Sequence, residues 1–285
     1  MNRTLVGPQE AWALLRGGAA VAIDCRADLA NRDPALADAL FATAHVPGAQ
    51  RADLERDLSD LSIPGRGRHP LPDVADFARC LSAWGIAPDT PVIAYDAMNG
   101  ALAAARLWWM LRLVGHDAAM VLDGGWQAWQ AAGLPVETGR AAPANVQRTL
   151  EYERAQIVDT DGLQHDLMGS RIALLDARAA PRFRGEVEAL DPVAGHVPGA
   201  RNRPYTDNLA PDGRFKLPAL LAAEFRALLG DRPPQDTVMM CGSGVTACHN
   251  LLAMEHAGLH GARIYPGSWS EWVSDRLRPV ATGPE

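Results

Sequence analysis

The sequence predicts an α/β protein built from two tandem copies of one domain, each a parallel sheet with helices on both faces. Two observations lead to this prediction. Short apolar, β-rich runs alternate with helix-like stretches, as expected for a parallel sheet that is covered on both sides. In addition, four short motifs of the first half recur in the same order in the second half, which indicates an internal repeat.

The repeated motifs include a pentapeptide, His-Val-Pro-Gly-Ala, that is identical in the two halves. Each half also carries a Gly-x-Trp-x-x-Trp sequence. Because the offset between the matches is nearly constant, we interpret the chain as a duplicated domain. The matched segments are 21–26 and 173–178, 45–49 and 196–200, 91–96 and 236–241, and 123–129 and 266–272.

The order of elements follows from the same patterns. Apolar residues at helical spacing predict helices that alternate with the strand-like runs. The connection between the two copies is expected where prolines occur and periodic apolar residues are few. We assign residues 1–138 to an N-terminal copy, 139–156 to a linker and 157–285 to a C-terminal copy. Examples of the predicted helices are 73–84, 102–114, 217–229 and 246–256.

Composition limits the classes of partner and cofactor. The net charge is −7 and basic residues form no long run, so nucleic acid and anionic membrane surfaces are not expected partners. No apolar run approaches the ~20 residues that span a bilayer, and the first residues lack the apolar core of a secretion signal. Four cysteines without a C-x-x-C pair predict neither a disulfide framework nor a metal site. We therefore expect a cytoplasmic protein without metal or cofactor.

The motif with the most chemical content is Cys-Gly-Ser-Gly-Val-Thr-Ala, which begins at Cys241. It follows an apolar strand-like run and precedes a predicted helix. The glycines let backbone N–H groups turn inward and form an anion-binding concavity, and the helix N-terminus favours a thiolate. The alternative is a buried structural cysteine. The first copy has Asp96 at the corresponding place, so only the second copy can perform thiol chemistry.

Taken together, these motifs resemble the two-domain rhodanese-type sulfurtransferases over essentially the whole chain. The resemblance implies two rhodanese-like domains and covalent catalysis, in which Cys241 takes sulfur from a small-molecule donor as a persulfide. The expected acceptor is cyanide, a small thiol or a thioredoxin-like protein. Phosphatases of this fold carry an arginine six residues after the cysteine, where this chain has Ala247. Phosphate chemistry is therefore not expected.

The loop is similar to that of mercaptopyruvate-using members. Thiosulfate-preferring members carry basic residues directly after the cysteine, whereas this chain has Gly242 and Ser243. We therefore expect 3-mercaptopyruvate as the donor. Thiosulfate as the donor and a non-enzymatic persulfide carrier or scaffold remain the alternatives.

The resemblance also implies the roles of individual residues. The expected catalytic residues are Cys241, Ser243, His69 and Glu55. His69 would shuttle a proton, and Glu55 would orient it from a position that the family usually fills with aspartate. The two histidines of the repeated pentapeptide are instead expected to form hydrogen bonds within their own turns.

Arginine side chains and the residues of the Cys241 loop are expected to bind the sulfur donor. Arg182 matches the family arginine that binds a substrate carboxylate. The family's second arginine, nine positions later, is replaced by Asp191, so Arg184, Arg201 or Arg203 would have to supply a second charge. The expected substrate-binding residues are Arg182, Gly242, Gly244, Val245, Thr246 and Arg203.

Overall fold

The computed structural model describes residues 3–27, 34–139 and 145–284. The chain divides into two compact units, each with one sheet in which every strand pair is parallel. This confirms the predicted fold class. The first unit comprises Met1–Asp60, Leu71–Glu153 and Asp212–Arg214, and the second comprises Leu61–Pro70, Arg154–Pro211 and Phe215–Glu285.

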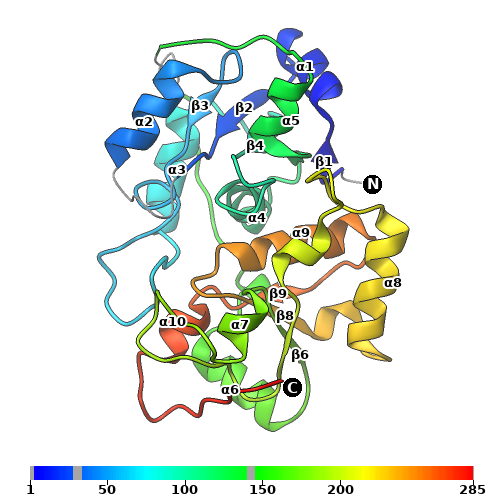
Figure 1. The fold of residues 1–285 in the computed structure, drawn as a ribbon. Helices are drawn as coiled ribbons and strands as arrows, with labels where there is room; N and C mark the ends of the chain where they lie inside the picture. The colour runs from blue at the N-terminus through cyan, green and yellow to red at the C-terminus, as the bar shows by residue number, and fades with distance from the viewer. Residues whose placement is uncertain (1–2, 28–33, 140–144, 285) are drawn as a thin grey trace. The chain divides into compact units, whose positions relative to one another are not determined.

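The first unit contains a five-stranded sheet with the order β1-β5-β4-β2-β3 (Figure 1). The strands are β1 (Leu5–Val6), β2 (Val21–Asp24), β3 (Gln50–Arg51), β4 (Val92–Tyr95) and β5 (Ala119–Leu122). The helices are α1 (Pro8–Arg16), α2 (Pro34–Thr43), α3 (Val74–Ala83), α4 (Ala104–Leu113) and α5 (Gly125–Ala131).

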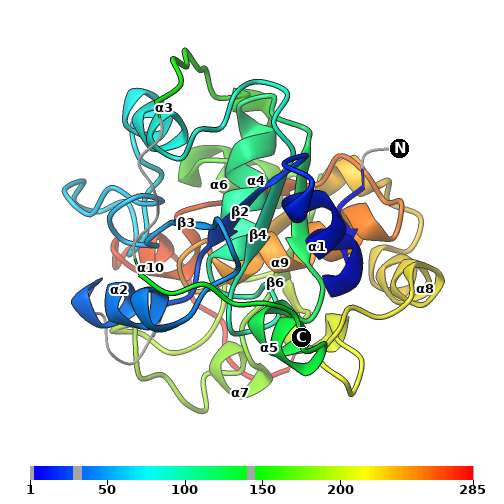
Figure 2. The same ribbon diagram turned by 90° about the horizontal axis from the view of Figure 1, so that it is seen from above.

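Helices cover both faces of this sheet. Successive side chains of a strand point to opposite faces, so each strand packs against helices on both sides. Helices α1, α2 and α5 contribute Ala11, Phe41 and Trp129 to one core cluster, together with Ile93 of β4. Figure 2 shows α3 and α4 on the opposite side of this sheet. The buried strands are therefore apolar almost throughout, as expected for a parallel sheet with two covered faces.

The second unit contains a four-stranded sheet with the order β7-β6-β8-β9. Ile157 forms an isolated parallel bridge to Ile264 at the edge of this sheet, where β1 pairs with β5 in the first unit. The strands are β6 (Ala173–Asp176), β7 (Ala200–Asn202), β8 (Thr237–Met240) and β9 (Arg263–Ile264). The helices are α6 (Thr160–Met168), α7 (Ala180–Phe183), α8 (Pro218–Leu229), α9 (Thr246–His256) and α10 (Ser268–Trp272), with short 3-10 turns η1 (Arg154–Gln156), η2 (Tyr205–Asn208) and η3 (Pro234–Asp236).

The core of the second unit repeats the arrangement of the first. Leu163, Phe183 and Trp269 place α6, α7 and α10 against one face of the sheet, where they pack with Val238 of β8. Helix α9 contacts β8, β9 and α8. The four predicted helices correspond to α3, α4, α8 and α9 within two residues at each end, so these predictions are confirmed.

Local side-chain interactions support the duplication. Asp24 accepts hydrogen bonds from the Arg26 guanidinium, which lies 4.4 Å from the ring centroid of Trp126. In the second unit, Asp176 holds Arg178 in the same way. The Arg178 guanidinium lies 4.7 Å from the ring centroid of Trp269. The repeated Asp-x-Arg sequence therefore fixes a turn in each unit.

The two repeated histidines have matching structural contacts. His45 Nδ1 lies 2.8 Å from the carbonyl oxygen of Phe41, and His196 Nδ1 lies 2.8 Å from that of Phe183. Each imidazole stacks on the ring of the same phenylalanine. The expectation that each bonds within its own turn holds for His45, whose partner lies four residues earlier, but not for His196, whose partner Phe183 ends α7, 13 residues earlier.

Two segments bear on the predicted domain boundaries. The predicted linker, 139–156, lies partly outside the described residues, and its portion up to Glu153 belongs to the first unit. There the Val146 and Glu153 N–H groups donate to the carbonyls of Ser82 and Leu113. Residues 61–70 belong to the second unit, although they precede most of it in sequence. Among the described helices, none has both the length and the apolar character needed to cross a bilayer.

Candidate functional site

Cys241 lies directly after β8, at the carboxyl end of a central strand of the second sheet. Ligands of open α/β sheets bind beyond this end of the strands. The residue is 2 % exposed, and its backbone is held from two sides. Its N–H donates to Ser268 Oγ at 3.0 Å, and its carbonyl accepts from the Trp269 N–H at 3.0 Å. The start of α10 therefore fixes the position of Cys241.

The loop that follows requires a glycine at position 244. Gly244 has φ +75°, and a methyl group at its Cα would lie 2.3 Å from the carbonyl oxygen of Pro266. Both the left-handed conformation and the close backbone contact exclude larger residues without local movement. This contact holds the loop against the turn that precedes α10.

The loop presents unpaired backbone N–H groups. Helix α9 begins at Thr246 without a side-chain cap on its N-terminus. The N–H groups of Gly242, Ser243 and Val245 make no hydrogen bond to any part of the chain that the structure describes. Buried N–H groups without partners are rare in proteins, and at a helix N-terminus they form a site for an anion.

The corresponding loop of the first unit holds an anionic side chain. The Asp96 carboxylate accepts hydrogen bonds from the N–H groups of Met98, Gly100, Leu102 and Ala104, at 2.8, 2.8, 3.0 and 3.2 Å. Burial raises the pKa of this carboxyl, while the four N–H groups act in the opposite direction. The strand–loop–helix connection of this fold can therefore surround an anion with backbone N–H groups.

Ser243 is joined to His69. Its Oγ lies 2.8 Å from His69 Nδ1, and the two residues are 7 % and 5 % exposed. The structure thus brings together three of the four predicted catalytic residues on and beside one loop. The fourth, Glu55, lies in the first unit, where its N–H donates to the Asp53 carboxylate at 3.0 Å. Its role in orienting His69 remains a prediction.

Residues 61–70 bring His69 to this site. Arg66 pairs with Glu271 at 3.4 Å, and the Arg68 N–H donates to Ser270 Oγ at 3.0 Å. Gly67 has φ +86°, and a methyl group on it would lie 2.7 Å from the carbonyl oxygen of Gly267. Three successive residues are therefore anchored on the start of α10, which also fixes Cys241.

A network of alternating charges lies beside the loop. Arg182 donates to Glu188 through Nε and Nη2 at 3.1 and 2.7 Å, and its Nη2 also reaches Asp191 at 3.2 Å. The other oxygen of Asp191 accepts from Arg68 Nη1. A methyl group placed on Gly242 would lie 2.9 Å from Arg68 Nη2 and 3.6 Å from Arg182 Nη1. Two guanidinium groups therefore face the residue that follows Cys241.

The pKa values of the two carboxyl groups of this network shift in opposite directions. Burial raises the pKa of the Asp191 carboxyl, and this outweighs its contact with Arg68. Burial acts in the same direction on Glu188, but hydrogen bonds from Arg182 and from the N–H groups of Leu190 and Asp191 hold the pKa of Glu188 below its usual range. Glu188 is therefore the firmer anchor for Arg182.

The comparisons with known proteins agree with this geometry. The Rhodanese-like domain matches residues 7–132 and again residues 159–275. The chain belongs to the rhodanese family. A protein of Pseudomonas aeruginosa named "Probable 3-mercaptopyruvate sulfurtransferase" is 48% identical over 283 residues, which cover 98% of each chain.

Other relatives of this rhodanese-family chain are named after two different sulfur donors, thiosulfate and 3-mercaptopyruvate. The thiosulfate sulfurtransferase of Cricetulus griseus is 37% identical, over 80% of this chain and 77% of its own. The crystal structure of the 3-mercaptopyruvate sulfotransferase SseA from Escherichia coli superposes with a TM-score of 0.81 at 30% identity, covering 93% of this chain and 98% of that one.

The other arginines considered from the sequence have protein partners. Arg203 donates to Glu224 at 2.6 Å and lies over the ring of Phe225, so its use in donor binding remains a prediction. Arg184 pairs with the exposed Glu186. Arg68, which faces Gly242, was not among the sequence-based candidates. The only sequence signal for it is its position directly before His69.

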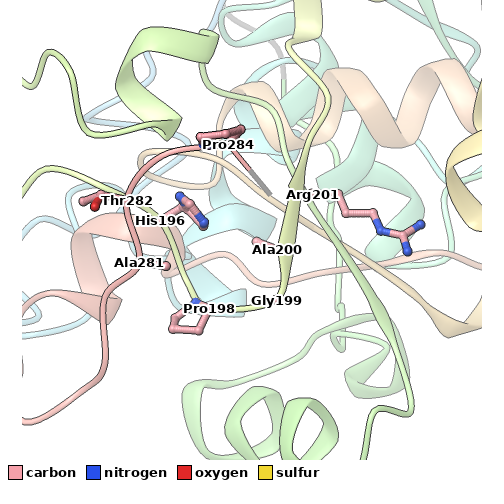
Figure 3. Close-up of a pocket in the computed structure, with 8 residues that line it drawn as sticks. All are labelled: His196, Pro198, Gly199, Ala200, Arg201, Ala281, Thr282 and Pro284. Atoms are coloured by element: carbon pink, nitrogen blue, oxygen red, sulfur yellow. The ribbon is translucent and has the colours of Figure 1, made fainter.

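A separate hollow of about 380 Å³ in the second unit is lined by His196, Pro198 and Ala281, among others. Figure 3 shows Arg201 extending away from the other lining residues, and its guanidinium donates to the carbonyl of Leu228. Neither Cys241 nor the residues of its loop line this hollow. Within the described ranges, no three His, Cys, Asp or Glu side chains are grouped so that they could hold a metal ion.

Proposed function

We propose that this chain is a cytoplasmic sulfurtransferase that takes sulfur from 3-mercaptopyruvate onto Cys241 and passes it to a thiophilic acceptor. The main support is the Cys241 loop, in which a buried cysteine at a strand end is followed by unpaired backbone N–H groups and faced by two guanidinium groups. Membership of the rhodanese family and the names of its relatives support the same reaction class.

In the first half-reaction the Cys241 thiolate attacks the thiol sulfur of the donor. A sulfur–sulfur bond forms, and the carbon–sulfur bond breaks with its electron pair going to carbon. The thiol proton ends on that carbon, so the donor leaves as pyruvate and the enzyme keeps a persulfide anion. Sulfur is oxidised and carbon is reduced by the same two electrons, so no external oxidant is needed.

The surrounding residues suit the charges that develop during this step. The N–H groups of the loop and the N-terminus of α9 stabilise the negative charge of the persulfide. Ser243 and His69, 2.8 Å apart, can carry a proton to the leaving enolate. In the second half-reaction cyanide, a small thiol or a dithiol of the thioredoxin type removes the outer sulfur.

Thiosulfate is the second candidate donor, and one observation favours it. Two guanidinium groups face Gly242 rather than one, and a dianion is stabilised by two cations. A persulfide carrier without turnover is the remaining alternative. The two donors are distinguished by measuring kcat/KM for each of them side by side, and the carrier by the absence of turnover with either.

The direct test is mass spectrometry after treatment with each donor. We expect one added sulfur atom, on the peptide that contains Cys241, and none in the Cys241→Ser protein. Burial raises the pKa of the Cys25 thiol, and it raises that of Cys80 to about 11, so these thiols stay protonated at neutral pH. Sulfur found on Cys25, Cys80 or Cys248 in place of Cys241 would contradict the proposal.

A further inference from the structure

The repeated pentapeptide forms the same turn in both units, so each turn can be compared with its copy. In each unit the histidine of the pentapeptide pairs with a later segment through one antiparallel bridge. The bridge joins His45 to Glu137 in the first unit and His196 to Ala281 in the second. In both cases the two residues exchange a pair of backbone hydrogen bonds. Glu137 and Ala281 therefore occupy equivalent positions.

In the first unit a carboxylate binds this turn. The Gly48 N–H donates to Glu137 Oε2 at 2.7 Å. Gly199 is the equivalent glycine of the second unit, with φ +83° against +73° for Gly48. Its N–H makes no hydrogen bond among the residues that the structure describes, and Ala281 has only a methyl group where the first unit has the carboxylate. The second unit thus keeps the donor and lacks the acceptor.

The hollow of the second unit lies at this turn. Its volume is about 380 Å³, and Gly199, Ala281, Pro198, Ala200 and Pro284 are among the residues that line it. Small-molecule sites commonly measure ~300–1,000 Å³. Figure 3 shows that the lining residues come from two segments, the turn that leads into β7 and the C-terminal segment. Apolar walls around one N–H donor suit a ligand with a short hydrocarbon chain and one acceptor group.

The second unit also has a cation beside the hollow. Gln50 pairs with Ile23 in the first sheet, and Arg201 pairs with Leu175 in the second, so arginine replaces glutamine at equivalent positions. Arg201 is exposed, and in the described part of the chain it has no carboxylate partner. An exposed charge acts over about 10 Å in salt solution. Because Arg201 lies two residues from Gly199, it can attract an anion into the hollow without leaving its own hydrogen bond.

The C-terminal wall of the hollow is held in place by close backbone contacts. Gly195 has φ +119°, and a methyl group on it would lie 2.3 Å from the carbonyl oxygen of Ala281. The Gly283 N–H donates to the carbonyl of Arg184 at 2.9 Å. A ligand therefore enters a preformed hollow, and its binding requires little further ordering of the chain.

We propose that this hollow is a binding site for short-chain monocarboxylates, in which the Gly199 N–H binds the carboxylate and Arg201 supplies the opposite charge. The hydrocarbon chain of the ligand lies against the apolar lining residues. Neither Cys241 nor its loop lines the hollow, so the site is separate from sulfur transfer and takes its ligand whether or not the chain transfers sulfur.

The binding test is a titration of the isotopically labelled full-length protein with butyrate, followed by NMR. We expect a saturable shift of the Gly199 N–H resonance. Butyramide, which has the same chain without the charge, should bind at least about tenfold more weakly, as for the loss of a charge-assisted hydrogen bond. Sodium chloride at equal concentration controls for ionic strength. Equal binding of butyrate and butyramide, or a Gly199 resonance that butyrate does not shift, would overturn the proposal.

Two variants test whether the ligand occupies this hollow. Ala281→Glu restores the residue of the first unit, so its carboxylate should shift the Gly199 resonance without ligand and abolish the response to butyrate. Arg201→Gln should raise Kd for butyrate about twofold to fivefold, the range for an exposed ion pair. The matched control is Arg232→Gln, because Arg232 is in the same unit and also donates to a backbone carbonyl. This control should leave Kd unchanged.

The outcomes of the variant experiments are equally decisive. Butyrate binding that survives Ala281→Glu would place the ligand outside the hollow. An equal effect of Arg201→Gln and Arg232→Gln would show that only the net charge of the protein matters. Either result contradicts the assignment of the carboxylate to the Gly199 turn.

Discussion

Replacing Gly244 by alanine tests whether the contact between the Cys241 loop and the Pro266 turn is needed. The residue has φ +75°, for which alanine carries a cost of about 1–2 kcal/mol. Its methyl group would also lie 2.3 Å from the Pro266 carbonyl oxygen, so one of the two segments must move. Overpacking of this kind costs about 1–3 kcal/mol more. We therefore expect Gly244→Ala to lower the free energy of unfolding by about 2–5 kcal/mol.

Gly258 is a matched control in the same unit. It has φ +76°, and a methyl group on it would meet no atom within 4 Å. Gly258→Ala should therefore show the conformational cost alone and leave sulfur transfer unchanged. Urea unfolding gives the stabilities, and the rate of sulfur loading on Cys241 gives the function. If the two variants lose the same stability and load sulfur at the same rate, the contact at Gly244 does not hold the loop in place.

Two further predictions concern side chains beside the loop. Ser243→Ala should lower kcat by roughly tenfold to a hundredfold, and adding His69→Ala should cost little more, because the two residues act as one unit; fully additive losses in steady-state assays would contradict their coupling. Glu188→Gln should destabilise the protein by about 1.5–3 kcal/mol at pH 7, because the hydrogen bonds from Arg182 are to a charged group. Since the pKa of Glu188 is lowered on folding, this stabilisation is present above its ordinary value of 4.5 and is lost as the pH falls through the folded value. Urea unfolding at several pH values should show the difference between the two proteins shrinking in acid, and a constant difference would contradict it.

The fold could be predicted from the sequence because the duplicated domain repeats short motifs, and each motif has the same structural role in both units. The Asp-x-Arg and Trp-x-x-Trp motifs recur because each unit needs the same turn and the same aromatic packing. Strand β1 has only two residues, and its equivalent in the second unit is a single bridge at Ile157. Periodicity over so few residues carries no signal, so these edges were not predicted.

The site was predicted in part. Cys241 could be named because it lies in a recognisable local motif, whereas the roles of Ser243 and His69 followed from the resemblance to the rhodanese-type sulfurtransferases. Arg68 could not be named, because its contact with Asp191 joins segments 123 residues apart, and no local pattern shows that residues 61–70 belong to the second unit. The arginines that the sequence offers for a second cation, such as Arg203, lie closer to Arg182 along the chain, but the guanidinium of Arg203 is held by Glu224.

The Asp96 loop has a consequence for how much sulfur one molecule can carry. Four of its backbone N–H groups donate to a carboxylate that belongs to the chain and cannot dissociate. A soluble anion would have to displace that tethered group, whose effective concentration far exceeds that of any free ligand. The Asp96 carboxylate therefore prevents the loop of the first unit from binding a free anion. Titration with an excess of donor should saturate at one sulfur atom per chain.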